Sequence, residues 1–159
     1  MLFYALLKTV HLLSVVLWVG GMFFALYCLR PALGTLEPPQ RVRLMRDVLG
    51  RFLDVVAIAA GLALLTGGWM IFRNVRAADK VGLGMNMPLD WYAMAVLGLL
   101  MIAIFCHIRF ALFRRLDRAV AAQAWPDGAA ALASIARAVR INLAIGFVVI
   151  VVTRAAAVM

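Results

Sequence analysis

The sequence predicts an all-α integral membrane protein: a four-helix bundle of up-down-up-down topology with helical extensions into the cytoplasm. Hydrophobic residues make up 67% of the 159 residues and charged residues only 14%, with a mean hydropathy of +1.03. A soluble domain of this size cannot bury so much apolar surface. We therefore expect one transmembrane domain over residues 1–159, because no change of composition divides the chain.

Four apolar tracts approach or exceed the roughly 20 residues that a helix needs to cross a bilayer. They cover approximately residues 2–29, 52–72, 89–113 and 141–158. Each tract is far longer than the ~10 residues of a barrel strand. Open strand edges in lipid would also leave backbone groups unpaired, so the tracts are predicted to be helices.

The segments between the tracts predict where helices begin and end. Arg30-Pro31 is expected to end the first helix, and Pro38-Pro39 to begin an amphipathic lead-in that continues into the second span. Residues 109–123 should carry the third helix out of the membrane before WPDG (125–128) restarts a helix. The connection 74–90, with its glycines and proline, is predicted to be a loop or short turn.

Eleven of the sixteen Lys and Arg residues lie around the two connections that follow the first and third spans. The positive-inside rule places these connections in the cytoplasm and both termini in the periplasm of a bacterial inner membrane. The net charge of +9 does not indicate nucleic acid, because the basic residues flank helices and do not alternate with aromatic ones. Membrane lipid is the expected partner of this charge, and Cys28 and Cys106 are not expected to form a disulfide.

A polar and aromatic stripe follows one face of the first helix, where Tyr4, Lys8, His11, Trp18 and Met22 align at 100° per residue. Lys8 either reaches the outer membrane surface or faces the bundle interior with a partner. His11 lies one turn deeper. It is either hydrogen-bonded to another helix or a ligand of a metal or haem.

Further candidate ligands lie at the two mouths of the bundle. Met85 and Met87 form a thioether pair on the outer side, of the kind that binds Cu(I), although packing alone would also explain methionines there. Cys106 and His107 lie toward the inner side. His11 and His107 differ in depth by roughly 12 Å, so one haem held by both is not expected.

A structural polar cluster is predicted at the inner ends of the helices. Asp54 can pair with Arg51, Arg109 or Arg140, and Asn142 is expected to join this group. Lys8 is assigned to the structural polar groups at the other end. For Asp54, a structural ion pair is favoured over a role in proton transfer.

HLLSVVLWVGGMFF, LRPAL, LLTGGWMIF, HIRFALFRR and RINLAIG together resemble the copper resistance protein D family of small integral membrane proteins. The likeness covers nearly the whole chain. It implies a four-helix bundle in a bacterial inner membrane, associated with copper uptake or handling, for which a periplasmic copper protein is an expected partner. His11 and Trp18 match its pattern in the first helix.

The spacing of Lys8, His11, Trp18 and Gly21 is also similar to that of the four-helix membrane protoporphyrinogen oxidases, which are haem-associated. The segment ALYCLRPALG and the lack of a lysine in the third tract depart from that group. The first hypothesis is therefore copper handling or uptake. The alternative is a haem b redox protein or porphyrinogen oxidase with His11 as axial ligand and Trp18 and His107 at the cofactor, and a third possibility is an accessory subunit.

Overall fold

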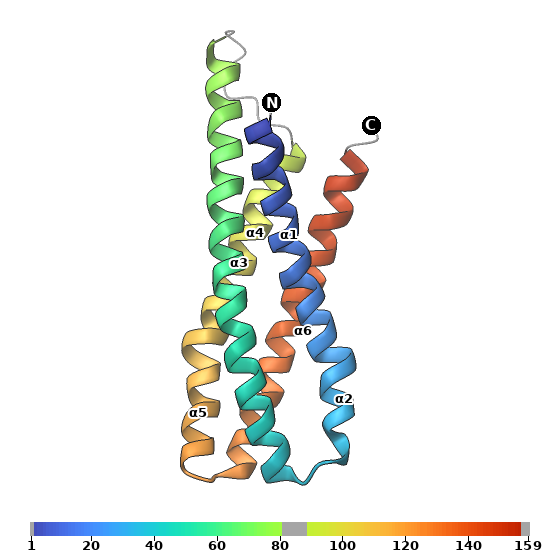
Figure 1. Cartoon of the computed structure of the whole chain (residues 1–159), viewed down its shortest axis with the longest axis vertical. Coiled ribbons are helices and arrows are strands. Elements are labelled where there is room, and N and C mark those ends of the chain that lie inside the picture. Colours follow the sequence, from blue (N-terminus) through green and yellow to red (C-terminus); the bar gives the residue numbers. More distant parts are fainter. Residues whose placement is uncertain (1, 81–88, 157–159) are drawn as a thin grey trace.

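A computed structural model describes residues 2–80 and 89–156. Within these residues the chain is almost entirely helical and contains no strand, and four helices are long and apolar enough to span a membrane. The predicted all-α membrane bundle is confirmed. Both ends of the described chain lie at one end of the bundle, here called the terminal end, and the two tight connections lie at the other, the hairpin end (Figure 1).

The first helix runs further than the sequence indicated. α1 (Leu2–Phe24) continues through a π-helical segment, Ala25–Leu29, into α2 (Arg30–Ala32) and a short 3-10 turn, Leu33–Thr35. The prediction that Arg30-Pro31 ends the helix was therefore wrong. A proline needs no hydrogen-bond acceptor for its nitrogen, and the wider π turn just before it accommodates its ring without breaking the axis.

α3 is one continuous helix, Pro38–Lys80, so the amphipathic lead-in to the second span is confirmed. Its buried side chains recur at helical spacing along the lead-in, at Val42, Met45, Leu49 and Leu53. The helix also takes in residues 74–80, which had been assigned to the loop. Those residues include no glycine or proline, and the helix continues for as long as its residues favour it.

The third span is α4 (Leu89–His107), followed by a π-helical segment, Ile108–Leu112, and α5 (Phe113–Ala121). The chain then reverses at Gln123, whose φ of 55° is left-handed. Ala124 N–H donates to the Ala119 carbonyl and Gln123 N–H to that of Val120, which is a Schellman motif. α6 (Trp125–Ala156) begins directly after it, so WPDG forms the first turn of the helix.

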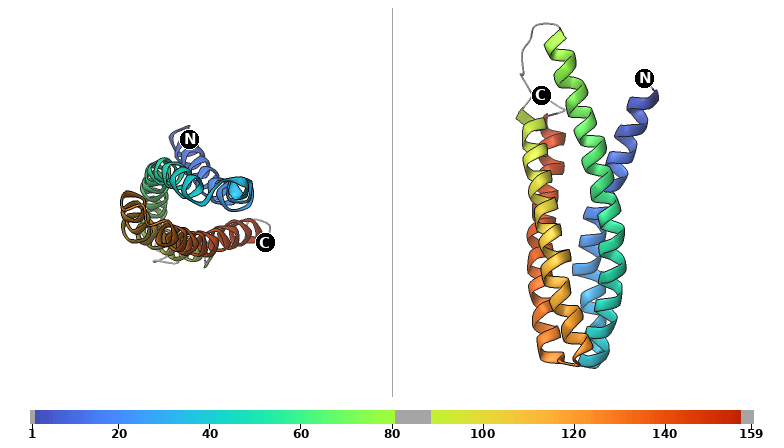
Figure 2. Two further views of the ribbon diagram at one scale, coloured as in Figure 1. Left: turned by 90° about the horizontal axis from the view of Figure 1, so that it is seen from below. Right: turned by 90° about the vertical axis from the view of Figure 1, so that its left-hand side faces the viewer.

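The helices pack mainly as two pairs: α1 against α3, and α4 with α5 against α6 (Figure 2). Buried side chains from all four spans form one core, which includes Trp18, Met22, Val56, Met101 and Leu143. Many large apolar side chains point outward instead, among them Leu13, Ile58 and Leu65. Since lipid tails are as apolar as these side chains, an apolar outer surface is what a membrane bundle requires.

Gly146 is buried where α6 meets both α1 and α4. A Cβ on this glycine would lie 3.0 Å from Val19 Cγ2 and 3.4 Å from Met101 Cε. Small residues at such crossings let helices approach closely. Gly146 therefore lets α6 pack closely against both α1 and α4.

Gly146→Leu is expected to lower the free energy of unfolding by about 1–3 kcal/mol, because the added side chain overpacks this crossing. Gly68→Leu is the matched control, since nothing lies within 4 Å of a Cβ at that exposed position. Thermal unfolding in mild detergent compares the two. Equal midpoints for both variants would contradict the close crossing at Gly146.

Candidate functional site

His11 is held against α3 by its Nδ1 nitrogen. Nδ1 lies 3.0 Å from the Ala63 carbonyl oxygen and 3.1 Å from Thr66 Oγ1. The ring is half-buried between α1 and α3, and Thr66 is fully buried. Of the two alternatives for His11, a hydrogen bond to another helix is therefore present.

These contacts determine which ring nitrogen carries the proton. A backbone carbonyl only accepts hydrogen bonds, so Nδ1 must donate. The Thr66 hydroxyl is positioned to agree, since it donates to the Leu62 carbonyl at 2.6 Å and so presents an oxygen lone pair to Nδ1. Nδ1 of a neutral His11 therefore bears the hydrogen, and Nε2 has a lone pair for which the described residues offer no partner.

Gly67 makes room for the imidazole. A Cβ on Gly67 would lie 3.0 Å from His11 Cε1 and 3.4 Å from Nδ1. The segment ALLTGG (63–68) of α3 thus supplies three features at once: the Ala63 carbonyl, the Thr66 hydroxyl, and a surface without a side chain at Gly67. Metal-binding histidines commonly donate their other ring N–H to a carbonyl, which fixes the ring and orients the ligating nitrogen.

Toward the hairpin end, the stripe on α1 enters the core. Trp18 is buried and packs edge-on against Phe105 of α4, with ring centroids 6.0 Å apart. Met22 is 2% exposed and Met101 of α4 is 5% exposed, and both belong to the same buried cluster as Trp18. Two thioether sulfurs from different helices are therefore enclosed in the bundle interior.

Asn142 brings a polar group into this core. Its side chain on α6 is 1% exposed, and its amide oxygen has no hydrogen-bond partner among the described residues. It precedes Gly146, which contacts Val19 and Met101, by one helical turn. An unpaired acceptor buried among apolar side chains lowers stability, so this asparagine is costly to the fold.

The other candidate ligands are more scattered. Cys106 is half-buried at the margin of the core, whereas His107 and Cys28 are exposed. Met85 and Met87 lie outside the described residues. Within the described residues no three His, Cys, Asp or Glu side chains lie close enough together to hold a metal ion.

The predicted inner polar cluster is not one assembly. Arg109 donates to Asp54 at 2.8 Å, and this pair lies on the surface, where Asp54 is 66% exposed. Arg140 is exposed, and Asn142 is in the core, apart from the ion pair. Lys8 is exposed at the terminal end, where its long side chain can reach the membrane surface.

Sequence reasoning did not identify Ala63, Thr66 and Gly67 as partners of His11. A hydroxyl beside two glycines in an apolar helix is the signal that could have found them. Met101 carried no such signal, because its place beside Gly146 depends on how α4 and α6 cross.

The family comparison agrees with this architecture. The family described as copper resistance protein D matches residues 46–156, which include α3 from its lead-in onward, α4, α5 and α6. No curated protein and no solved structure matches the chain.

Asn142→Leu is expected to stabilise the protein by about 1 kcal/mol, because it replaces an unpaired buried amide with an apolar side chain of similar volume. The unfolding midpoint in mild detergent measures the change. Leu143→Ala, next to it in the core, serves as the opposite control and should destabilise by about 2–5 kcal/mol. A lower midpoint for Asn142→Leu would mean that the amide oxygen is hydrogen-bonded in the folded protein.

Proposed function

Since this chain belongs to the copper resistance protein D family, we propose that it carries Cu(I) through the helix bundle, with His11 as a ligand inside the membrane. The protein is a multi-pass membrane protein with four candidate spans. We place it in a bacterial inner membrane with the terminal end in the periplasm. The excess of arginine at the hairpin end supports that orientation.

The observation that carries the proposal is the orientation of His11. Its Nδ1–H is committed to the Ala63 carbonyl, so Nε2 is the nitrogen that can bind a cation. Neutral imidazole is a ligand for copper, and a carbonyl that accepts the N–H of the other ring nitrogen strengthens such a ligand.

The interior beyond His11 offers soft ligands rather than charged ones. Met22 and Met101 supply thioether sulfurs, which favour Cu(I) over harder cations, and the Asn142 amide oxygen lacks a partner in the same core. We propose that an ion passes from His11 to these groups and leaves near Cys106 and His107. Met85 and Met87 would collect copper at the periplasmic mouth.

This set of ligands favours passage over storage. Ligands that come one or two at a time along the bundle bind an ion more weakly than a closed set of three or four. Conduction requires binding that is strong enough for entry but weak enough for release. Copper would therefore be an ion that the protein transports and not a bound cofactor. A periplasmic copper protein would deliver or receive it.

The haem alternative finds no support in the geometry around His11 or in the comparison. One edge of the imidazole packs against Gly67, and Trp18 packs edge-on against Phe105, where it contributes to the core and not to a cofactor pocket. His107 is exposed.

Cu(I) uptake into vesicles containing the purified protein tests the proposal. His11→Ala should reduce the rate by at least about tenfold, which is the order of loss for a disturbed metal ligand. Thr66→Val, which removes one acceptor for Nδ1 but keeps the ring, should give an intermediate rate. Thr9→Ala is the control, because among the described residues exposed Thr9 bonds only to the Ala5 carbonyl of its own helix.

Two results would overturn the assignment. One is uptake by His11→Ala at the rate of the unchanged protein, with the variant shown to be folded by its unfolding midpoint. The other is an equal loss in Thr9→Ala, which would trace the effect to α1 in general rather than to the imidazole.

A further inference from the structure

A cavity lies between the first helix, α3 and α6 near the hairpin end, away from His11. Its volume is about 180 Å³, and its walls are apolar, with Leu26, Leu49, Leu132 and Val139 among them. Three alanines on α1–α2 and α6, Ala25, Ala129 and Ala136, leave the space between the helices. Nothing in the copper proposal uses it.

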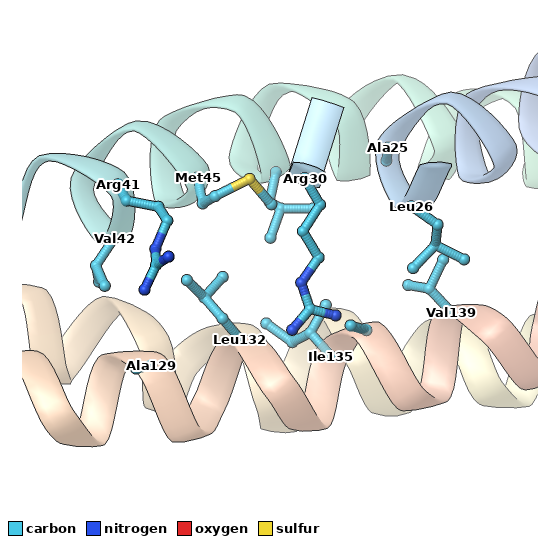
Figure 3. A pocket seen from close by; sticks show the side chains of 12 residues that line it. Ala25, Leu26, Arg30, Arg41, Val42, Met45, Ala129, Leu132, Ile135 and Val139 are labelled. Carbon is cyan, nitrogen blue, oxygen red and sulfur yellow. The ribbon is translucent and has the colours of Figure 1, made fainter. Parts of the chain in front are cut away.

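Two arginines enter this otherwise apolar space. Arg30 extends from α2 and Arg41 from the first turns of α3, and both point across the gap toward α6 (Figure 3). Arg41 is half-buried. Arg30 is exposed, and its guanidinium group and that of Arg41 repel each other, so the space between them attracts an anion.

The protein does not supply that anion within its described residues. The ion pairs found there engage Asp47 and Asp117 with Arg46, and Asp54 with Arg109. Neither Arg30 nor Arg41 has a carboxylate within 4.0 Å in this part of the chain. Arg43, by contrast, lies over the ring of Trp125, with its guanidinium carbon 4.8 Å from the ring centroid.

The level at which the cavity lies along the bundle indicates which kind of molecule fills it. Leu26 and Val139 lie at the side nearer the apolar spans, and Val42 and Ala129 at the side nearer the hairpin connections, with the two guanidinium groups between them (Figure 3). With the hairpin end in the cytoplasm, as proposed above, the arginines mark the head-group side of the cavity, and Leu26 and Val139 lie on the side of the acyl chains.

We propose that this cavity binds one anionic phospholipid, with its phosphate held by Arg30 and Arg41 and an acyl chain against the apolar wall. Guanidinium groups recognise phosphate oxygens by charge-assisted hydrogen bonds. Basic pockets between transmembrane helices on the side facing the cytoplasm bind anionic head groups in this way. The lipid joins α2 and α3 to α6 at the hairpin end, where the protein's own side chains leave a gap.

Native mass spectrometry of protein extracted from vesicles of equal parts phosphatidylglycerol and phosphatidylcholine tests the proposal. The unchanged protein should retain one phosphatidylglycerol in preference to phosphatidylcholine. Arg30→Gln with Arg41→Gln should reduce this preference by at least about tenfold, since charge-assisted hydrogen bonds are lost. Arg114→Gln with Arg115→Gln, which removes the same charge from exposed positions on α5, should leave it unchanged.

A third variant separates the cavity from surface charge. Ala136→Leu fills part of the space and keeps both arginines, so it should reduce retention of the lipid while the net charge stays the same. Unfolding midpoints verify that each variant is folded.

Several outcomes would overturn the proposal. Equal retention in the unchanged protein and the Arg30/Arg41 variant would remove the role of the arginines. An equal loss of lipid retention in both double variants would mean that general surface charge, and not this cavity, attracts the lipid. Displacement of the lipid by excess inorganic phosphate would show that the cavity binds a free anion. A dimer that retains no lipid would show that a second copy of the chain occupies the cavity.

Discussion

Hydrocarbon offers no hydrogen-bond partners, and the way in which His11 meets this constraint organises the bundle. The imidazole must find its acceptor within the chain, and it finds the Ala63 carbonyl and the Thr66 hydroxyl on α3. The contact needs α3 to approach closely, which Gly67 allows. The pairing of α1 with α3, the rotation of α1 about its axis and the protonation of Nδ1 are thus linked through one side chain.

The rotation set by His11 also determines what the rest of α1 places in the core. Trp18 and Met22 follow at helical spacing and are buried, Trp18 against Phe105 of α4, while Lys8 is exposed. Asn142 then adds a polar atom that no described group satisfies. An apolar residue at this position would make the protein more stable, so the unpaired buried amide is consistent with the proposed role in passing an ion.

The sequence was sufficient for the fold class, the spans and the lead-in of α3, because hydropathy and helical period report directly on which residues face lipid. It was insufficient for the end of the first helix, since a π turn lets the chain continue through Pro31. The pair of Asp54 and Arg109 was among the alternatives considered, but the separation of Asn142 from it was not foreseen. Such contacts depend on how helices rotate and cross, which spacing along one helix does not determine.

The orientation of His11 is open to direct observation by ¹⁵N NMR of the histidine-labelled protein in a bilayer, with His107→Gln used to identify its resonances. The account predicts a neutral ring with the hydrogen on Nδ1, and a change on addition of Cu(I) that is largest at Nε2 and leaves the hydrogen on Nδ1. A ring protonated at Nε2, or a spectrum of His11 that Cu(I) leaves unchanged, would contradict it.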